Sequence, residues 1–219
     1  MPTPLPFLDP STPSLKICGV TTPGDAHRLA ELGVHALGAN FWPRSKRYLD
    51  PALGGFLRDL AGSILRVGVF VNAGTGLPVS LFKEGLIDVV QLHGDEPESD
   101  IPLIQRHGIP VIRALAVDEN GSLPNVQEFG AEGVLLDAHA PGVYGGTGET
   151  IDWDAAGDFV KEHPKLPVIL AGGITPENAE EALQTVRPAA IDIASGAESA
   201  PGIKDFAKVE QLMAAVRQA

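Results

Sequence analysis

The feature that most constrains the fold of this chain is a regular alternation of short apolar runs with helical patterns. Eight strands are expected, over residues 15–19, 36–41, 65–71, 88–93, 110–117, 133–138, 168–171 and 190–194. Helical patterns lie over residues 23–32, 53–60, 79–84, 99–107, 126–129, 153–162, 176–186 and 204–217. Such alternation predicts parallel strands joined by right-handed crossovers. Eight units favour an α/β fold closed as a single-domain (β/α)8 TIM barrel.

An open doubly wound sheet is the rival fold. It is less favoured because no early GxGxxG turn is present and the alternation continues past the usual six strands. The length of 219 residues suits one barrel domain. We assign residues 15–219 to the barrel and residues 1–14 to a proline-rich N-terminal tail.

Composition limits the possible partners and the compartment. The formal net charge of −12 argues against binding to nucleic acid, which needs a basic face. No run approaches the 18 apolar residues of a membrane span, and the first residues lack the features of a signal peptide, so a cytoplasmic protein without membrane contact is expected. The single cysteine, Cys18, excludes an internal disulfide and a CxxC motif.

Two strands near the C-terminus each end in a glycine turn. Gly172 and Gly173 follow the seventh expected strand, and Ser195 and Gly196 follow the eighth. One such turn alone is as typical of a simple helix entry, where Thr175 would be the N-cap before a first helical residue at Pro176. Two in succession favour a phosphate site, because glycine lets the backbone approach an anion and free N–H groups hold it.

In a barrel, chemistry collects at the C-terminal ends of the strands. Lys16 and Cys18 are two residues apart in a strand, so their side chains share one face. A lone cysteine is often an inert buried residue, but a thiolate beside a cation can act as a base. Asp137 ends an apolar run; it is either an ordinary loop or N-cap aspartate, or an acid whose pKa is raised by apolar walls and which suits proton donation.

Other polar side chains at these strand ends suggest binding roles. Gln91 and His93 share a face. A catalytic role for His93 is the less favoured alternative, and His93 is expected to bind a ligand oxygen or to cap the next helix. No second His or Cys stands at a ligand spacing nearby, so no metal site is predicted. Arginine is the natural partner of a carboxylate, and the densest positive cluster of this acidic chain follows the second strand, at Arg44, Lys46 and Arg47.

Two further features are expected to support the site. The glycine-rich stretch 144–149 is a candidate lid. Lys16, Arg113 and Asp192 are predicted to form an inward-facing charge cluster.

These residues together resemble the phosphoribosylanthranilate isomerase family of tryptophan biosynthesis, in the right order and over roughly residues 15–205. The resemblance rests on Lys16-Ile-Cys-Gly, Phe41-Trp-Pro-Arg-Ser-Lys-Arg-Tyr, Val67-Gly-Val-Phe-Val-Asn, Val90-Gln-Leu-His-Gly-Asp-Glu, Leu135-Leu-Asp, Tyr144-Gly-Gly-Thr-Gly, Ala171-Gly-Gly-Ile and Asp192-Ile-Ala-Ser-Gly-Ala-Glu. Two departures are Ala194, where a serine is expected, and the lead Asn40-Phe41-Trp42 into the basic loop.

The resemblance implies an Amadori rearrangement of a small phosphorylated substrate without metal or cofactor. A monomer or homodimer is expected. N-(5-phosphoribosyl)anthranilate would become 1-(2-carboxyphenylamino)-1-deoxyribulose 5-phosphate. The general base falls on Cys18 and the general acid on Asp137. Arg47 would bind the anthranilate carboxylate, and the phosphate would lie on the two glycine turns. The remaining expected substrate-binding residues are Gln91, His93 and Asp192.

Three alternatives remain open. The histidine-pathway aminoaldose isomerase performs the same rearrangement but uses an aspartate where Cys18 stands. Indole-3-glycerol-phosphate synthase would require a lysine acid and a longer N-terminal segment. A catalytically silent phosphate-binding barrel would need neither Cys18 nor Asp137.

Overall fold

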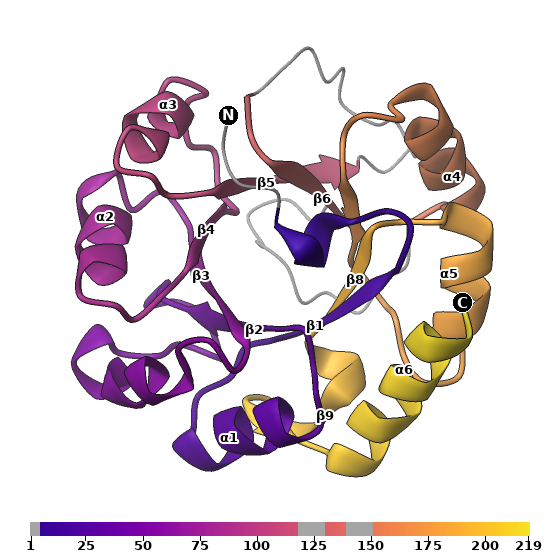
Figure 1. The fold of residues 1–219 in the computed structure, drawn as a ribbon, viewed down its shortest axis with the longest axis horizontal. Coiled ribbons are helices and arrows are strands. Elements are labelled where there is room, and N and C mark those ends of the chain that lie inside the picture. The colour runs from indigo at the N-terminus through magenta and orange to yellow at the C-terminus, as the bar shows by residue number, and fades with distance from the viewer. Residues whose placement is uncertain (1–4, 118–129, 139–150) are drawn as a thin grey trace.

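The computed structural model describes residues 5–117, 130–138 and 151–219. Figure 1 shows a central ring of strands surrounded by helices. The strands form a closed parallel barrel in sequence order, which confirms the predicted (β/α)8 fold. Every strand agrees with its predicted range to within one residue at either end: β1 (Ser14–Cys18), β2 (Ala36–Asn40), β3 (Leu65–Phe70), β4 (Val89–Leu92), β5 (Val111–Val117), β6 (Gly133–Ala138), β7 (Val168–Leu170) and β8 (Ala190–Ile193).

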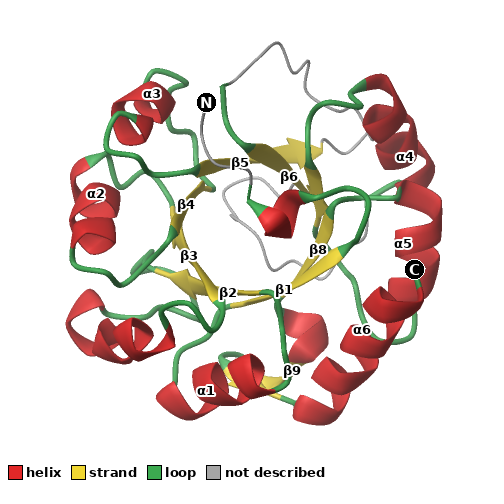
Figure 2. Cartoon of the chain, in the orientation of Figure 1, coloured by secondary structure: helices red, strands yellow, loops and turns green. Residues whose placement is uncertain are grey.

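The helices lie outside the ring of strands (Figure 2). They are α1 (Pro23–Glu31), α2 (Gly76–Lys83), α3 (Asp100–Gln105), α4 (Trp153–Glu162), α5 (Ala179–Val186) and α6 (Phe206–Gln218). The connection between β2 and β3 is a 3₁₀ helix, η2 (Pro51–Leu60), in which Gly54 and Gly55 disfavour a regular α-helix. The helix predicted over residues 126–129 lies outside the described residues. None of the described helices is long and apolar enough to cross a membrane.

Helix α5 begins later than predicted. The sequence indicated Thr175 as N-cap and Pro176 as first helical residue, but Asn178 holds the N-cap position and the helix begins at Ala179. The Asn178 side chain accepts a hydrogen bond from the Thr175 amide at 2.8 Å and donates to the Gly173 carbonyl at 3.1 Å. These local bonds stabilise a turn over residues 176–178 in place of a first helical turn.

Helix α6 also begins later than expected, because a small hairpin precedes it. A short 3₁₀ helix, η3 (Ser195–Ala197), leads into β9 (Glu198–Ala200), which pairs antiparallel with β10 (Ile203–Lys204). Asp205 then caps α6 by accepting hydrogen bonds from the amides of Ala207 and Lys208. The hairpin brings Glu198 and Lys204 beside the end of the barrel that carries the polar strand ends.

The end of the barrel at which the strands begin, here called the lower end, is closed by apolar side chains, and the end at which they finish is called the upper end. The 3₁₀ helix η1 (Pro6–Leu8) crosses the central ring in Figure 1, and Phe7 and Leu8 are each 5% exposed. They pack on an inner cluster formed by the strands, which includes Val67, Ile112 and Ile169. The tail predicted over residues 1–14 therefore contributes two buried side chains to the core, and the candidate site lies at the opposite end.

Candidate active site

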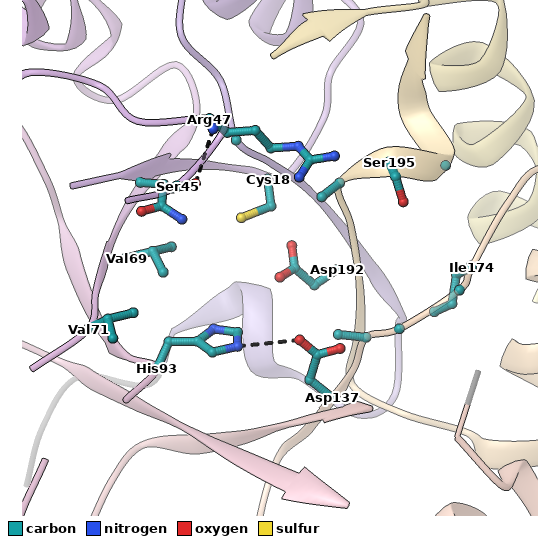
Figure 3. Close-up of a pocket in the computed structure, with 17 residues that line it drawn as sticks. Cys18, Ser45, Arg47, Val69, Val71, His93, Asp137, Ile174, Asp192 and Ser195 are labelled. Atoms are coloured by element: carbon teal, nitrogen blue, oxygen red, sulfur yellow. Dashed lines mark hydrogen bonds and ion pairs between the residues drawn. The ribbon is translucent and has the colours of Figure 1, made fainter. Parts of the chain in front are cut away.

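A pocket lies at the C-terminal ends of the barrel strands (Figure 3). Of the residues predicted for the site, the pocket is lined by Cys18, Arg47, His93, Asp137, Gly172, Gly173, Asp192, Ser195 and Gly196. Gln91 is not at its surface. The structure therefore brings together side chains and turns from both ends of the chain.

Asp137 and His93 form one side of the pocket. The Asp137 Oδ2 atom lies 3.3 Å from His93 Nε2, and its Oδ1 accepts from the amide of Ala138 at 3.0 Å. Gln91 is fully buried below, with its amide nitrogen 2.8 Å from His93 Nδ1. This contact holds the His93 ring from below. His93 therefore contacts Asp137, the predicted acid, and does not cap α3, which begins at Asp100.

Cys18 lies at the end of β1, beside a buried ion pair. Lys16 is fully buried, and its Nζ lies 2.8 Å from Asp192 Oδ1 on the neighbouring strand β8. Burial raises the pKa of Cys18 above its ordinary value and Asp192 raises it further, whereas Lys16 and Lys204 act to lower it. Burial alone would lower the pKa of Lys16, but Asp192 and Cys18 raise it above its ordinary value, so Lys16 stays charged.

Arg47 belongs to a second buried charge network. Its Nε lies 2.8 Å from Glu198 Oε1, and its Nη2 lies 2.7 Å from Oε2. Lys204 Nζ donates to Glu198 Oε1 at 2.7 Å and to the Cys18 carbonyl at 2.6 Å. The Arg47 side chain also packs over Gly19, where an added Cβ would overlap Arg47 Cδ. This network therefore links the predicted carboxylate-binding arginine to the backbone of the predicted base.

Sequence reasoning did not assign a role to Glu198. The residue closes the motif that begins at Asp192, and the available signal was an acidic residue a few positions after a glycine turn. Its cationic partner Arg47 is 151 positions away in the chain, so no local pattern pairs them. Within the basic loop, Arg47 lines the pocket, whereas Arg44 and Lys46 are exposed and Arg44 stacks over Trp42 at 5.5 Å.

The two glycine turns meet at one wall of the pocket. Gly172 and Gly173 have φ values of +85° and +60°, which favour glycine. An added Cβ on Gly196 would overlap the carbonyl oxygen of Ile174, so the turn after β8 packs directly on the turn after β7. The two turns are therefore neighbours, as predicted.

The predicted charge cluster is right for two residues and wrong for the third. Lys16 and Asp192 pair on adjacent strands, but Arg113 lies on β5 and donates to Glu96 Oε2 at 2.8 Å and to the Gly94 carbonyl at 3.1 Å. Arg113 therefore holds the loop after β4. The glycine-rich stretch 144–149 predicted as a lid lies outside the described residues. Among residues 5–117, 130–138 and 151–219, no group of three His, Cys, Asp or Glu side chains could hold a metal ion.

Comparison with known proteins agrees with this geometry. A family model described as N-(5'-phosphoribosyl)anthranilate (PRA) isomerase matches residues 15–215. The N-(5'-phosphoribosyl)anthranilate isomerase of Geotalea daltonii is 41% identical over 200 residues, which cover 91% of this chain and 94% of that protein.

Two solved structures show the same fold. The phosphoribosyl anthranilate isomerase of Thermus thermophilus superposes with a TM-score of 0.82 at 38% identity, over 94% of this chain and 98% of its own. Another phosphoribosyl anthranilate isomerase, in complex with reduced 1-(o-carboxyphenylamino)-1-deoxyribulose 5-phosphate, gives a TM-score of 0.77 at 29% identity, over 94% and 100%. The barrel, the pocket and these matches together show that the chain belongs to the N-(5'-phosphoribosyl)anthranilate isomerase family.

Proposed function

We propose that the chain isomerises N-(5'-phosphoribosyl)anthranilate to 1-(2-carboxyphenylamino)-1-deoxyribulose 5-phosphate in tryptophan biosynthesis, with Asp137 as general acid and Cys18 as general base. One observation carries the assignment of roles. Cys18 from β1 and Asp137 from β6 line the same pocket, together with both glycine turns. A single sugar phosphate held at the turns can therefore present its ring to both side chains.

The reaction needs three proton transfers and no external oxidant or reductant. Asp137 donates a proton to the ribose ring oxygen, the bond from that oxygen to C1′ breaks, and the nitrogen lone pair forms an iminium ion. Cys18 then removes the proton from C2′, and the electron pair neutralises the iminium to give an enolamine. Transfer of the hydroxyl proton of the enolamine to C1′ completes the ketone. General acid or base steps of this kind contribute roughly 100- to 10,000-fold each.

Substrate positioning falls to the rest of the pocket. Arg47 is bound to Glu198 through Nε and Nη2, which leaves its Nη1 edge for the anthranilate carboxylate. The phosphate binds the backbone of Gly172, Gly173 and the turn at Ser195 and Gly196. His93 and Asp192 hydrogen-bond the ribose hydroxyls. Gln91, buried beneath His93, contributes to substrate binding by orienting that ring.

The histidine-pathway substrate is the second candidate. Cys18 in place of an aspartate disfavours it, and so does a carboxylate-binding arginine held in a rigid network. A silent binding barrel is disfavoured because binding alone needs neither Cys18 nor Asp137. We further propose that the enzyme acts without metal, cofactor or nucleic acid and is cytoplasmic. It is a monomer or homodimer, and light scattering of the purified chain measures which of the two it is.

The decisive experiment follows the fluorescence of phosphoribosylanthranilate with wild type and Asp137→Asn at equal concentration and with folding confirmed by circular dichroism. Rapid decay with wild type and a rate lower by roughly 100- to 10,000-fold with the variant is expected. Equal rates would refute the role of Asp137 as acid. If wild type does not consume this substrate, the isomerase proposal fails and the histidine-pathway substrate is tested next.

A further inference from the structure

The buried ion pair between Lys16 and Asp192 is not explained by stability. Both residues lie inside the barrel, with Lys16 fully buried and Asp192 8% exposed. Removing two charges from water costs several kcal/mol per ion, and well-packed apolar residues in the same space are often as stable or more so. The lower layer of this barrel shows that alternative, because it is filled with apolar side chains. The pair therefore points to a role in the site above it.

Space for this pair to reach Cys18 comes from a glycine on the neighbouring strand. Gly38 on β2 stands opposite Cys18 in the strand register. A Cβ added to Gly38 would lie 2.8 Å from Cys18 Sγ and 3.0 Å from Lys16 Nζ. The sulfur and the ammonium thus border the same small space, so the charge of Lys16 lies close to the Cys18 sulfur. An ammonium has three donors, so Lys16 can serve Asp192 and Cys18 together.

Several other charges face Cys18, and each has another partner. Lys204 donates to Glu198 and to the Cys18 carbonyl, and Arg47 is bound to the same Glu198. Across the pocket, Asp137 lies beside His93. Among these described groups, Lys16 is the cation that shares the space beside Gly38 with the sulfur.

We propose that Lys16 is a positioning residue for the base, and that its ammonium, oriented by Asp192, stabilises the thiolate that Cys18 must form before it accepts the C2′ proton. This inference rests on the proposed role of Cys18 in the reaction. Asp192 has two opposing effects in this arrangement. It orients the lysine, and its own negative charge opposes the thiolate. Removing Lys16 and removing Asp192 should therefore shift the pKa of the Cys18 thiol in opposite directions. A pair with a purely structural role would not have this effect.

The chain offers an unusually clean measurement, because Cys18 is its single cysteine. Ultraviolet absorbance of the thiolate as a function of pH, together with the pH dependence of alkylation by iodoacetamide, reads out Cys18 alone. An opposite charge within about 4–6 Å changes the thiolate fraction at fixed pH by about tenfold or more. Asp192→Asn should raise that fraction by about tenfold, and Lys16→Met should lower it by a similar factor.

Lys16→Met leaves Asp192 buried without a cation and can fail to fold, so the main comparison is made in a background without the carboxylate. The double variant Lys16→Met/Asp192→Asn should show about tenfold less thiolate than Asp192→Asn. Gly38→Ala keeps every charge and forces the two atoms apart, so it should lower the thiolate fraction too. Lys161→Met, which removes an exposed cation on α4, is the control and should leave the titration and the turnover unchanged.

The same variants separate this inference from the proposed function. If Lys16 acts through Cys18, the pH dependence of kcat/KM moves in the direction of the thiol titration. Equal thiolate profiles for the double variant and Asp192→Asn, both folded by circular dichroism, would overturn the inference while leaving the isomerase assignment intact. Full turnover by Cys18→Ser would instead refute Cys18 as the base, whatever the titration shows.

Discussion

Replacing Glu198 by glutamine tests the network that orients Arg47. The Glu198 side chain is 3% exposed and accepts from two cations, Arg47 at 2.7–3.0 Å and Lys204 at 2.7 Å. The amide of glutamine retains one acceptor oxygen and turns an NH₂ group toward the other cation. Breaking a buried charge pair costs about 3–5 kcal/mol, and a domain of this size loses about 2–4 °C of melting temperature per kcal/mol. We therefore expect Glu198→Gln to melt roughly 6–20 °C below wild type.

The same substitution should weaken substrate binding through Arg47. A hydrogen bond to a charged group contributes about 1.5–3 kcal/mol, which corresponds to a loss of roughly 10- to 150-fold in kcat/KM if the guanidinium loses its orientation. The assay is the fluorescence decay of phosphoribosylanthranilate at several substrate concentrations, with Arg47→Met and the double variant measured beside it. If Glu198 acts through Arg47, the double variant resembles Arg47→Met alone. Losses that multiply, or a Glu198→Gln variant that melts and turns over like wild type, would refute the reasoning.

Three further outcomes follow from the structure. Burial alone raises the pKa of Glu198, but hydrogen bonds from its two cations lower this pKa below its ordinary value. The contribution of Glu198 to stability is therefore present above about pH 4.3 and is lost as pH falls through the lower folded-state pKa. The difference in melting temperature between wild type and Glu198→Gln should accordingly shrink in acid. Leu8→Ala should lower the free energy of unfolding in urea by about 2–5 kcal/mol and leave kcat/KM unchanged. Leu53→Ala, at a 73% exposed position, is the control and should change neither quantity. A lower kcat/KM with Leu8→Ala would contradict the separation of the two barrel ends. Gly196→Ala should overlap the carbonyl of Ile174 and weaken competitive inhibition by inorganic phosphate about tenfold, for a displacement that costs about 1–3 kcal/mol; unchanged inhibition would place the phosphate elsewhere.

The strands could be predicted closely because each is a short apolar run bounded by polar or glycine residues, and local sequence carries that signal. The start of α5 could not, because the Asn178 side chain competes with the first helical turn. The hairpin of β9 and β10 could not be predicted because its strands have three and two residues, too few to show an alternation of apolar and polar side chains. Resemblance to a family marked Glu198 as part of a motif but supplied no partner for it.

The charge cluster shows why the site was harder to predict than the fold. Strand position predicts the depth of a side chain within the barrel, and it placed Lys16, Asp192 and Arg113 near the upper end. It does not predict the position around the ring, which decides which of them can touch. Lys16 and Asp192 lie on β1 and β8, which pair because the barrel closes, whereas Arg113 on β5 occupies the opposite wall. Closure of the ring, not sequence spacing, makes the ion pair.

The lower end of the barrel contributes mainly to stability, and the upper end holds the residues of the proposed reaction. At the lower end, Phe7 and Leu8 seal an apolar layer that contributes to folding without any charged group. At the upper end, Lys16 and Asp192 lie inside the barrel and Glu198 lies on the hairpin beside it; these buried charges cost free energy unless each keeps its partner. A barrel that only had to fold could extend the apolar layer upward. The buried charges lie around Cys18 and Arg47, so the stability given up at this end serves to hold the proposed base and the proposed carboxylate-binding arginine in fixed positions.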